Sequence, residues 1–130
     1  MDWAEVFVVF LISHLVGDFA IQTEWQAQHK HDGLGPDPAS RRALLAHVTT
    51  YTLVFVPAFV WLWSDLGFGV LALAALVFLP HLIQDDGRLV DRYVVHVKRT
   101  DPDAHPALRL AVDQTFHLVV LFGLALLVGA

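Results

Sequence analysis

The sequence predicts an all-α fold, an integral membrane four-helix bundle. Of its 130 residues, 56% are hydrophobic and only 16% are charged, whereas soluble domains are nearer half apolar and a quarter charged. Four apolar segments each approach the roughly 20 residues that a helix needs to cross a bilayer. The length allows one domain, so residues 1–130 are expected to form a single transmembrane domain.

The four expected spans are separated by one short and two long connections. They cover residues 3–22, 44–63, 68–85 and 108–128. The first span lacks a basic leading region and a small-residue cleavage site, so we expect a retained helix and not a secretory signal. The 64–69 turn is short, so the second and third spans should pack as antiparallel neighbours. Pro57 and Pro80 are expected to kink these two helices.

The two long connections are polar and carry the basic residues. The first, residues 23–42, contains Gly and Pro residues that prevent a continuous helix. The second, residues 86–107, begins with alternating basic and apolar residues, which favours a helix lying on the membrane surface. All 8 Lys and Arg residues lie in these connections or at their edge. Because cytoplasmic loops collect Lys and Arg, we expect a multi-pass protein of the cell (inner) membrane with both long loops cytoplasmic and both termini outside.

Each expected span carries one histidine in its cytoplasmic half. These are His14, His47, His81 and His117. Three of them have an aspartate four residues away, namely Asp18, Asp85 and Asp113. Residues four apart share one face of a helix. A bundle with these faces turned inward would therefore gather four imidazoles and three carboxylates into one cluster.

This combination of side chains is typical of a metal site. Neutral imidazole and carboxylate groups suit Zn²⁺, Mn²⁺, Fe²⁺ or Ni²⁺. We expect a divalent metal centre of one or two ions, with zinc favoured, for which all four histidines and all three aspartates are candidate ligands. The three aspartates are also candidate catalytic groups, as bridging ligands or as a general base. Further candidates for binding substrate or for orienting the ligands are Gln22, Tyr51, Arg88 and Gln114.

The favoured function is metal-dependent hydrolysis of an amphiphilic, lipid-like substrate at the membrane surface, with a metal-activated water as nucleophile. A metal-ion or proton transporter is an alternative, although the outer halves of the spans are almost purely apolar. A non-catalytic structural or partner-binding protein, whose polar cluster holds the bundle together, is another. A haem protein would leave the three aspartates unexplained. The net charge of −5 gives no sign of nucleic-acid binding.

Two of the motifs repeat, which favours two duplicated helical hairpins. The segments HLVGD (14–18) and HLIQD (81–85) share the pattern H-L-x-x-D. Each is followed by a histidine on the returning helix, as expected for repeats related by an axis along the membrane normal.

Four ordered motifs, HLVGDFAIQTEW, LLAH, HLIQD and DQTFH, resemble a family of small bacterial, archaeal and phage membrane proteins, domain of unknown function 3307. The resemblance covers nearly the whole chain. It implies functional positions at His14, Asp18, Gln22, Trp25, His47, His81, Asp85, Asp113, Gln114 and His117. Many members carry a lysine shortly after the third-helix aspartate, and Arg88 stands nearby in this chain. The pattern is also similar in style to membrane-bound metal-dependent hydrolases, which is an analogy and says nothing of the reaction.

Overall fold

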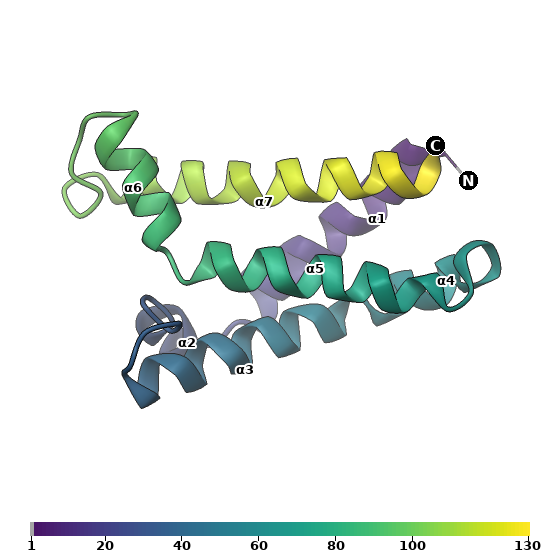
Figure 1. The fold of residues 1–130 in the computed structure, drawn as a ribbon, viewed down its shortest axis with the longest axis horizontal. Helices are drawn as coiled ribbons and strands as arrows, with labels where there is room; N and C mark the ends of the chain where they lie inside the picture. Colours follow the sequence, from purple (N-terminus) through teal and green to yellow (C-terminus); the bar gives the residue numbers. More distant parts are fainter. Residues whose placement is uncertain (1) are drawn as a thin grey trace.

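The computed structural model describes residues 2–130, and these residues form seven α-helices and one π-helical turn, with no strand. The elements are α1 (Trp3–Leu15), η1 (Val16–Ile21), α2 (Glu24–His29), α3 (Pro38–Val54), α4 (Val56–Leu66), α5 (Gly69–Asp85), α6 (Arg88–His96) and α7 (Pro106–Gly129). The long helices run along the long axis of the molecule, and α1 begins at the end where α7 finishes (Figure 1). The all-α prediction is confirmed.

The first helix starts at a side-chain cap and ends in a wider turn. The Asp2 carboxylate accepts from the backbone N–H of Ala4, and the Glu5 carboxylate accepts from the backbone N–H of Asp2. From Val16 to Ile21 the chain continues as a π-helix. Single π-helical turns inside helices often occur at functional sites, and this one carries Asp18.

Two helical segments are long and apolar enough to cross a membrane alone. They are Trp3–Ile21, which joins α1 to η1, and α7. Two pairs of consecutive helices are also long and apolar enough if each pair is counted as one broken span. These are α3 with α4, bent by 54°, and α5 with α6, bent by 57°. By length and composition, residues 2–130 therefore provide two spans, or up to four with the bent pairs.

The two bends have different causes. The break between α3 and α4 falls at Phe55, directly before the first turn of α4, which contains Pro57. Proline has no N–H to donate to the preceding turn, so the expected kink lies here. Pro80, by contrast, lies inside α5, which continues through it. The second bend falls instead at Gly87, whose φ of 86° leaves the helical region.

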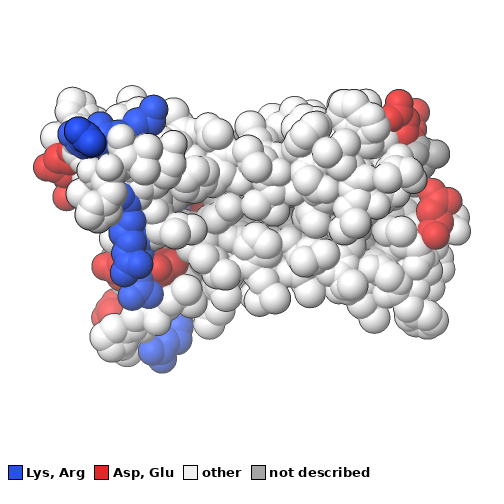
Figure 2. Space-filling view, turned by 45° about the horizontal axis from the view of Figure 1, so that its top comes forward, with Lys and Arg blue, Asp and Glu red and all other residues white. Residues whose placement is uncertain are grey.

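The apolar core occupies the half of the molecule that contains the chain ends. It is built from α1, α3, α4, α5 and α7, and its buried members include Val6, Phe10, Phe55, Leu62, Leu73 and Leu121. Many large apolar side chains are exposed on the outer helix faces, among them Val60, Phe68, Leu71, Val119 and Leu127. On the face shown in Figure 2, the middle of the molecule is almost free of charged side chains, and the Lys and Arg residues gather at one end. The buried histidines His14, His47, His81 and His117 lie between this core and the basic end.

Candidate metal centre

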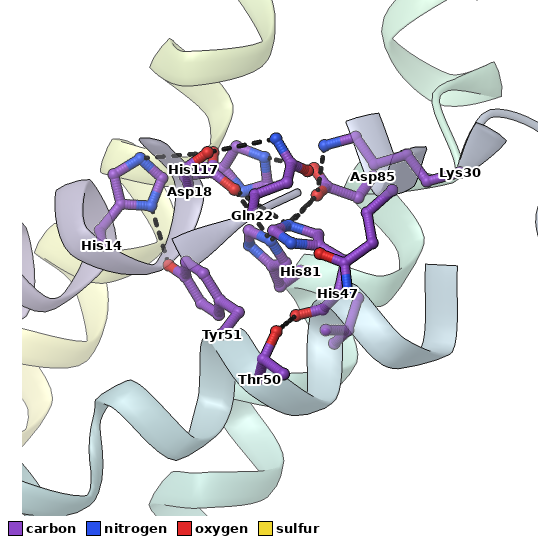
Figure 3. Close-up of polar contacts among 12 residues, drawn as sticks. His14, Asp18, Gln22, Lys30, His47, Thr50, Tyr51, His81, Asp85 and His117 are labelled. Carbon is purple, nitrogen blue, oxygen red and sulfur yellow. Dashed lines mark hydrogen bonds and ion pairs between the residues drawn. The ribbon is translucent and has the colours of Figure 1, made fainter. Parts of the chain in front are cut away.

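Four buried side chains from three helical segments converge on one point (Figure 3). They are Asp18 from η1, His47 from α3, and His81 and Asp85 from α5. One oxygen or nitrogen of each lies within 4.8 Å of the others, and the exposed fractions of the four residues are between 0% and 5%. We call these four residues the central group.

The distances within the central group are close to those between the ligands of a single ion. His47 Nε2 lies 3.1 Å from Asp18 Oδ1, 2.8 Å from Asp85 Oδ2 and 3.0 Å from His81 Nε2. His81 Nε2 lies 3.4 Å from Asp18 Oδ1 and 3.0 Å from Asp85 Oδ2. A tetrahedral ion with bonds of about 2.0–2.1 Å holds its donor atoms about 3.3 Å apart. The central group could therefore hold a metal ion with little rearrangement.

Both histidines of the central group turn Nε2 inward. Their Nδ1 atoms are buried, and among residues 2–130 neither has a hydrogen-bond partner. Metal-bound histidines usually donate the other ring N–H to a carboxylate, a carbonyl or water. Among the described residues, no such acceptor contacts Nδ1 of His47 or of His81. The His81 ring is held instead by packing, since the Tyr51 ring stacks on it with centroids 3.5 Å apart.

A second group of candidate ligands adjoins the first. It consists of Asp18, Asp113 and His117. His117 Nε2 lies 2.9 Å from Asp85 Oδ1 and 3.4 Å from Asp113 Oδ1. The two oxygens of Asp85 thus face different histidines, and Asp18 belongs to both groups. This arrangement has room for a second ion, or lets His117 hold the Asp85 carboxylate toward a single ion.

His14 lies outside both groups, although the sequence predicts it as a ligand. Its Nδ1 lies 2.8 Å from the Tyr51 hydroxyl, and its Nε2 lies 2.7 Å from Gln114 Oε1. The Gln114 amide group in turn donates to Asp18 Oδ2 at 2.9 Å. A neutral His14 therefore accepts from Tyr51 and donates to Gln114, and the chain of donors ends on the carboxylate of Asp18. His14 and Gln114 thus form a hydrogen-bonded chain that leads from the Tyr51 hydroxyl to Asp18.

Lys30 is a site residue that the sequence did not predict. It comes from the loop after α2, and its Nζ donates to Asp85 Oδ2 at 2.9 Å (Figure 3). The loop is fastened to the end of α5, where the backbone N–H groups of Asp32 and Leu34 donate to the backbone oxygen and the carboxylate of Asp86. The positive charge of Lys30 in a polar loop was its only signal in the sequence.

Arg88 and Gln22 lie at different distances from the centre. Arg88 donates to the Asp86 carboxylate at 2.7 Å and does not contact the central group. Burial alone would raise the pKa of Asp86, but the hydrogen bonds from Arg88 and Leu34 outweigh it and hold this pKa below its usual value. Gln22 donates to the backbone oxygen of Asp18 at 3.2 Å, so it is close to the centre.

These features define a helical protein with apolar candidate membrane spans and a buried His/Asp cluster that could hold a metal ion. The chain belongs to the family described as protein of unknown function DUF3307, which matches residues 6–129. The resemblance seen in the four sequence motifs is thereby confirmed. No curated protein and no solved structure matches the chain.

Proposed function

We propose that this protein is a four-span enzyme of the cell (inner) membrane that uses a divalent metal ion to hydrolyse an amphiphilic substrate at the cytoplasmic surface. The observation that carries the proposal is the convergence of Asp18, His47, His81 and Asp85 at ligand-like distances in a buried position. Ionisable groups are costly to bury among apolar helices and are rarely without function there.

The placement in the membrane is supported by the distribution of apolar and basic side chains. Trp3–Ile21, α7 and the two bent pairs supply up to four spans, and in this proposal they form an integral four-helix bundle. In the second pair α5 crosses the membrane, and α6, bent by 57° from it, lies at the surface with its basic residues. The Lys and Arg residues lie at the end that carries the two long loops. The positive-inside rule then places these loops in the cytoplasm and both termini outside. The metal centre accordingly lies near the cytoplasmic surface, where lipid-like substrates and water both have access.

The chemistry of the donor set favours zinc, and it also suits manganese, iron or nickel. A bound divalent ion with an open position acts as a Lewis acid and lowers the pKa of a bound water. Asp18 and Asp85 would hold the ion. Asp113 is only half-buried and borders a cavity next to Lys30 and Asp85, so in this proposal it serves as the general base.

Transport of an ion across the membrane is less well supported. A transporter needs polar groups along the whole depth of its path. Beyond the central group, the interior toward the chain ends is filled by apolar side chains such as Phe10, Phe55 and Leu62, which are fully buried. The polar residues thus end within the molecule, as expected for a reaction site entered from one side.

The metal content of detergent-purified protein tests the proposal. The wild type should carry one or two divalent ions per chain, and His47→Ala and Asp85→Asn should lose them. His105→Ala serves as the matched control, because His105 is exposed at the start of α7. Metal-loaded wild type should then hydrolyse amphiphilic esters or phosphoesters, and a chelator should stop the reaction. Wild-type protein without stoichiometric metal would overturn the proposal.

A further inference from the structure

A cavity of about 220 Å³ adjoins the central group. It lies between the loop after α2, the end of α5 and the start of α7. Residues that line it include Gln22, Lys30, Gln84, Asp85, Arg109 and Asp113. Asp85 belongs both to this cavity and to the central group, so a molecule in the cavity would contact the metal centre.

Two cationic side chains border the cavity and keep unused donors. Lys30 gives one hydrogen bond to Asp85 and has two further N–H groups. Arg109 uses its Nε for Asp91, at 2.6 Å. Its Nη groups have no acceptor among residues 2–130, which leaves the fork of the guanidinium free to bind a second group with two oxygens.

Gly87 makes the approach of these cations possible. A side chain at this position would begin 2.7 Å from Arg109 Nη2 and 2.5 Å from the His31 ring. Gly87 also lines the cavity and has a φ of 86°, which other residues rarely adopt. The missing side chain at Gly87 therefore leaves room for Arg109 and His31 at the rim of the cavity.

Two unpartnered amide oxygens are a separate sign of a polar ligand. The Oε1 atoms of Gln22 and Gln84 are buried, and neither has a hydrogen-bond partner among residues 2–130. Gln84 is 9% exposed, and both side chains line the cavity. Buried polar atoms are almost always satisfied, so a ligand with donors and acceptors in the cavity would complete this set. Rotation of the Gln84 amide by half a turn offers its NH₂ group to an anion.

The charges that line the cavity become favourable for an anion once a metal ion is present. The lining contains two cations, Lys30 and Arg109, and two carboxylates, those of Asp85 and Asp113. A dication held by the central group would add positive charge beside Lys30, which has N–H groups that Asp85 does not use. The Lys30 ammonium is then available to a negatively charged ligand.

We propose that this cavity binds a phosphoryl group of the substrate, held by Lys30 and Arg109 beside the metal centre. This inference rests on the proposed function and names the substrate class for it. A phosphoryl group presents three acceptor oxygens, which match an ammonium, a guanidinium fork and amide donors better than the two oxygens of a carboxylate. The cavity is smaller than the roughly 300–1,000 Å³ of pockets that enclose whole drug-sized ligands. It therefore takes a headgroup, while the apolar part of the substrate stays in the bilayer.

Binding of inorganic phosphate to metal-loaded protein tests the proposal. Lys30→Gln and Arg109→Gln should each weaken phosphate binding about tenfold or more, as expected when a charged hydrogen bond is lost. Lys98→Gln and Arg42→Gln are the matched controls, because both residues are exposed and lie outside the cavity lining. The controls should bind phosphate as the wild type does. Metal content is measured on every variant, and its retention shows that the site has folded.

A second experiment distinguishes a lipid headgroup from a soluble phosphate compound as the source of the phosphoryl group. Protein in phosphatidylcholine nanodiscs is compared with protein in nanodiscs that also contain phosphatidate. Displacement of phosphate by phosphatidate supports a lipid headgroup as the ligand, and phosphate binding without displacement supports a soluble phosphate compound. Metal-loaded wild type that binds phosphate in neither experiment, or a Lys30→Gln variant that binds it unchanged, overturns the subsite alone. Absence of metal from the wild type overturns the proposed function and the subsite together.

Discussion

The Nε2 atoms of His47 and His81 face each other 3.0 Å apart. Two imidazoles cannot both carry a proton on nitrogens at this distance, so at least one ring turns a lone pair inward. One carboxylate oxygen of Asp18 and one of Asp85 also lie close to His47 Nε2, at 3.1 and 2.8 Å. At least three electron-rich atoms therefore face one another in a buried position, where a cation between them would stabilise the arrangement.

The residues that orient Asp18 should affect metal affinity less than the central group does. Gln114→Leu removes the donor to Asp18 Oδ2, and we expect metal affinity to fall about 10–100-fold, as for other outer partners of ligands. His81→Ala should abolish binding. Thr115→Ala is the control, because Thr115 is exposed and its hydroxyl bonds only to Ala111 in its own helix. Competition with a fluorescent chelator measures all three, and equal affinity in Gln114→Leu and wild type would contradict the prediction.

The loop that carries Lys30 should depend on Asp86. Asp86→Asn weakens the acceptor for the Leu34 N–H and the pair with Arg88. We expect a loss of about 1–3 kcal/mol in the free energy that holds the loop in place. Trypsin should then cut after Lys30 faster than in the wild type. Asp103→Asn, in the exposed second loop, should leave the cutting rate unchanged, and a wild-type rate in Asp86→Asn would refute the expectation.

Close packing at Gly17 should be essential for the position of Tyr51. A methyl group at Gly17 would begin 2.7 Å from Tyr51 Cδ2. Gly17→Ala should therefore lower stability by about 1–3 kcal/mol through overpacking and weaken metal binding, because Tyr51 stacks on His81. Gly123→Ala meets no atom within 4 Å and should be neutral. Thermal unfolding in detergent compares the two variants, and equal stability of both would contradict the expected overpacking.

The orientation in the membrane can be tested with single cysteines, since the chain has none of its own. Ser64→Cys lies near the end of α4, beside the short connection, and Ala104→Cys lies in the second long loop. A membrane-impermeant maleimide applied to intact cells should label residue 64 and spare residue 104 until the cells are opened. The reverse labelling pattern would place the basic end outside.

The spacing of polar residues explains how much of the site could be predicted. His81 and Asp85 lie one turn apart on a regular helix, so the sequence alone predicts their common face, and His47 joins them at the same depth. In the matching segment HLVGD (14–18), the four-residue spacing does not predict a common face, because Asp18 lies in a π-helical turn. His14 has both ring nitrogens engaged by Tyr51 and Gln114. Such hydrogen bonds arise from tertiary contacts, and no periodicity in the sequence encodes them.

The loops were less accessible to prediction. The sequence offers Arg88 as a candidate near Asp85, and the structure shows that it forms an ion pair with Asp86. Lys30 reaches Asp85, 55 residues away in the sequence, through a loop whose path is set by backbone contacts with Asp86. Helices, in contrast, follow from apolar runs and from local caps such as Asp37 before α3, so the all-α class could be predicted without knowledge of these long-range contacts.

The π-helical turn from Val16 to Ile21 makes this segment sensitive to its length. Its wider ring is one residue longer than an α-helical turn. Deleting a single residue at its start would restore regular winding and change the angle at which Asp18 leaves the helix axis relative to α1. Asp18 would then point away from His47 while every side chain type at the site was kept. The segment should therefore accept many substitutions on its outer face but no insertion or deletion.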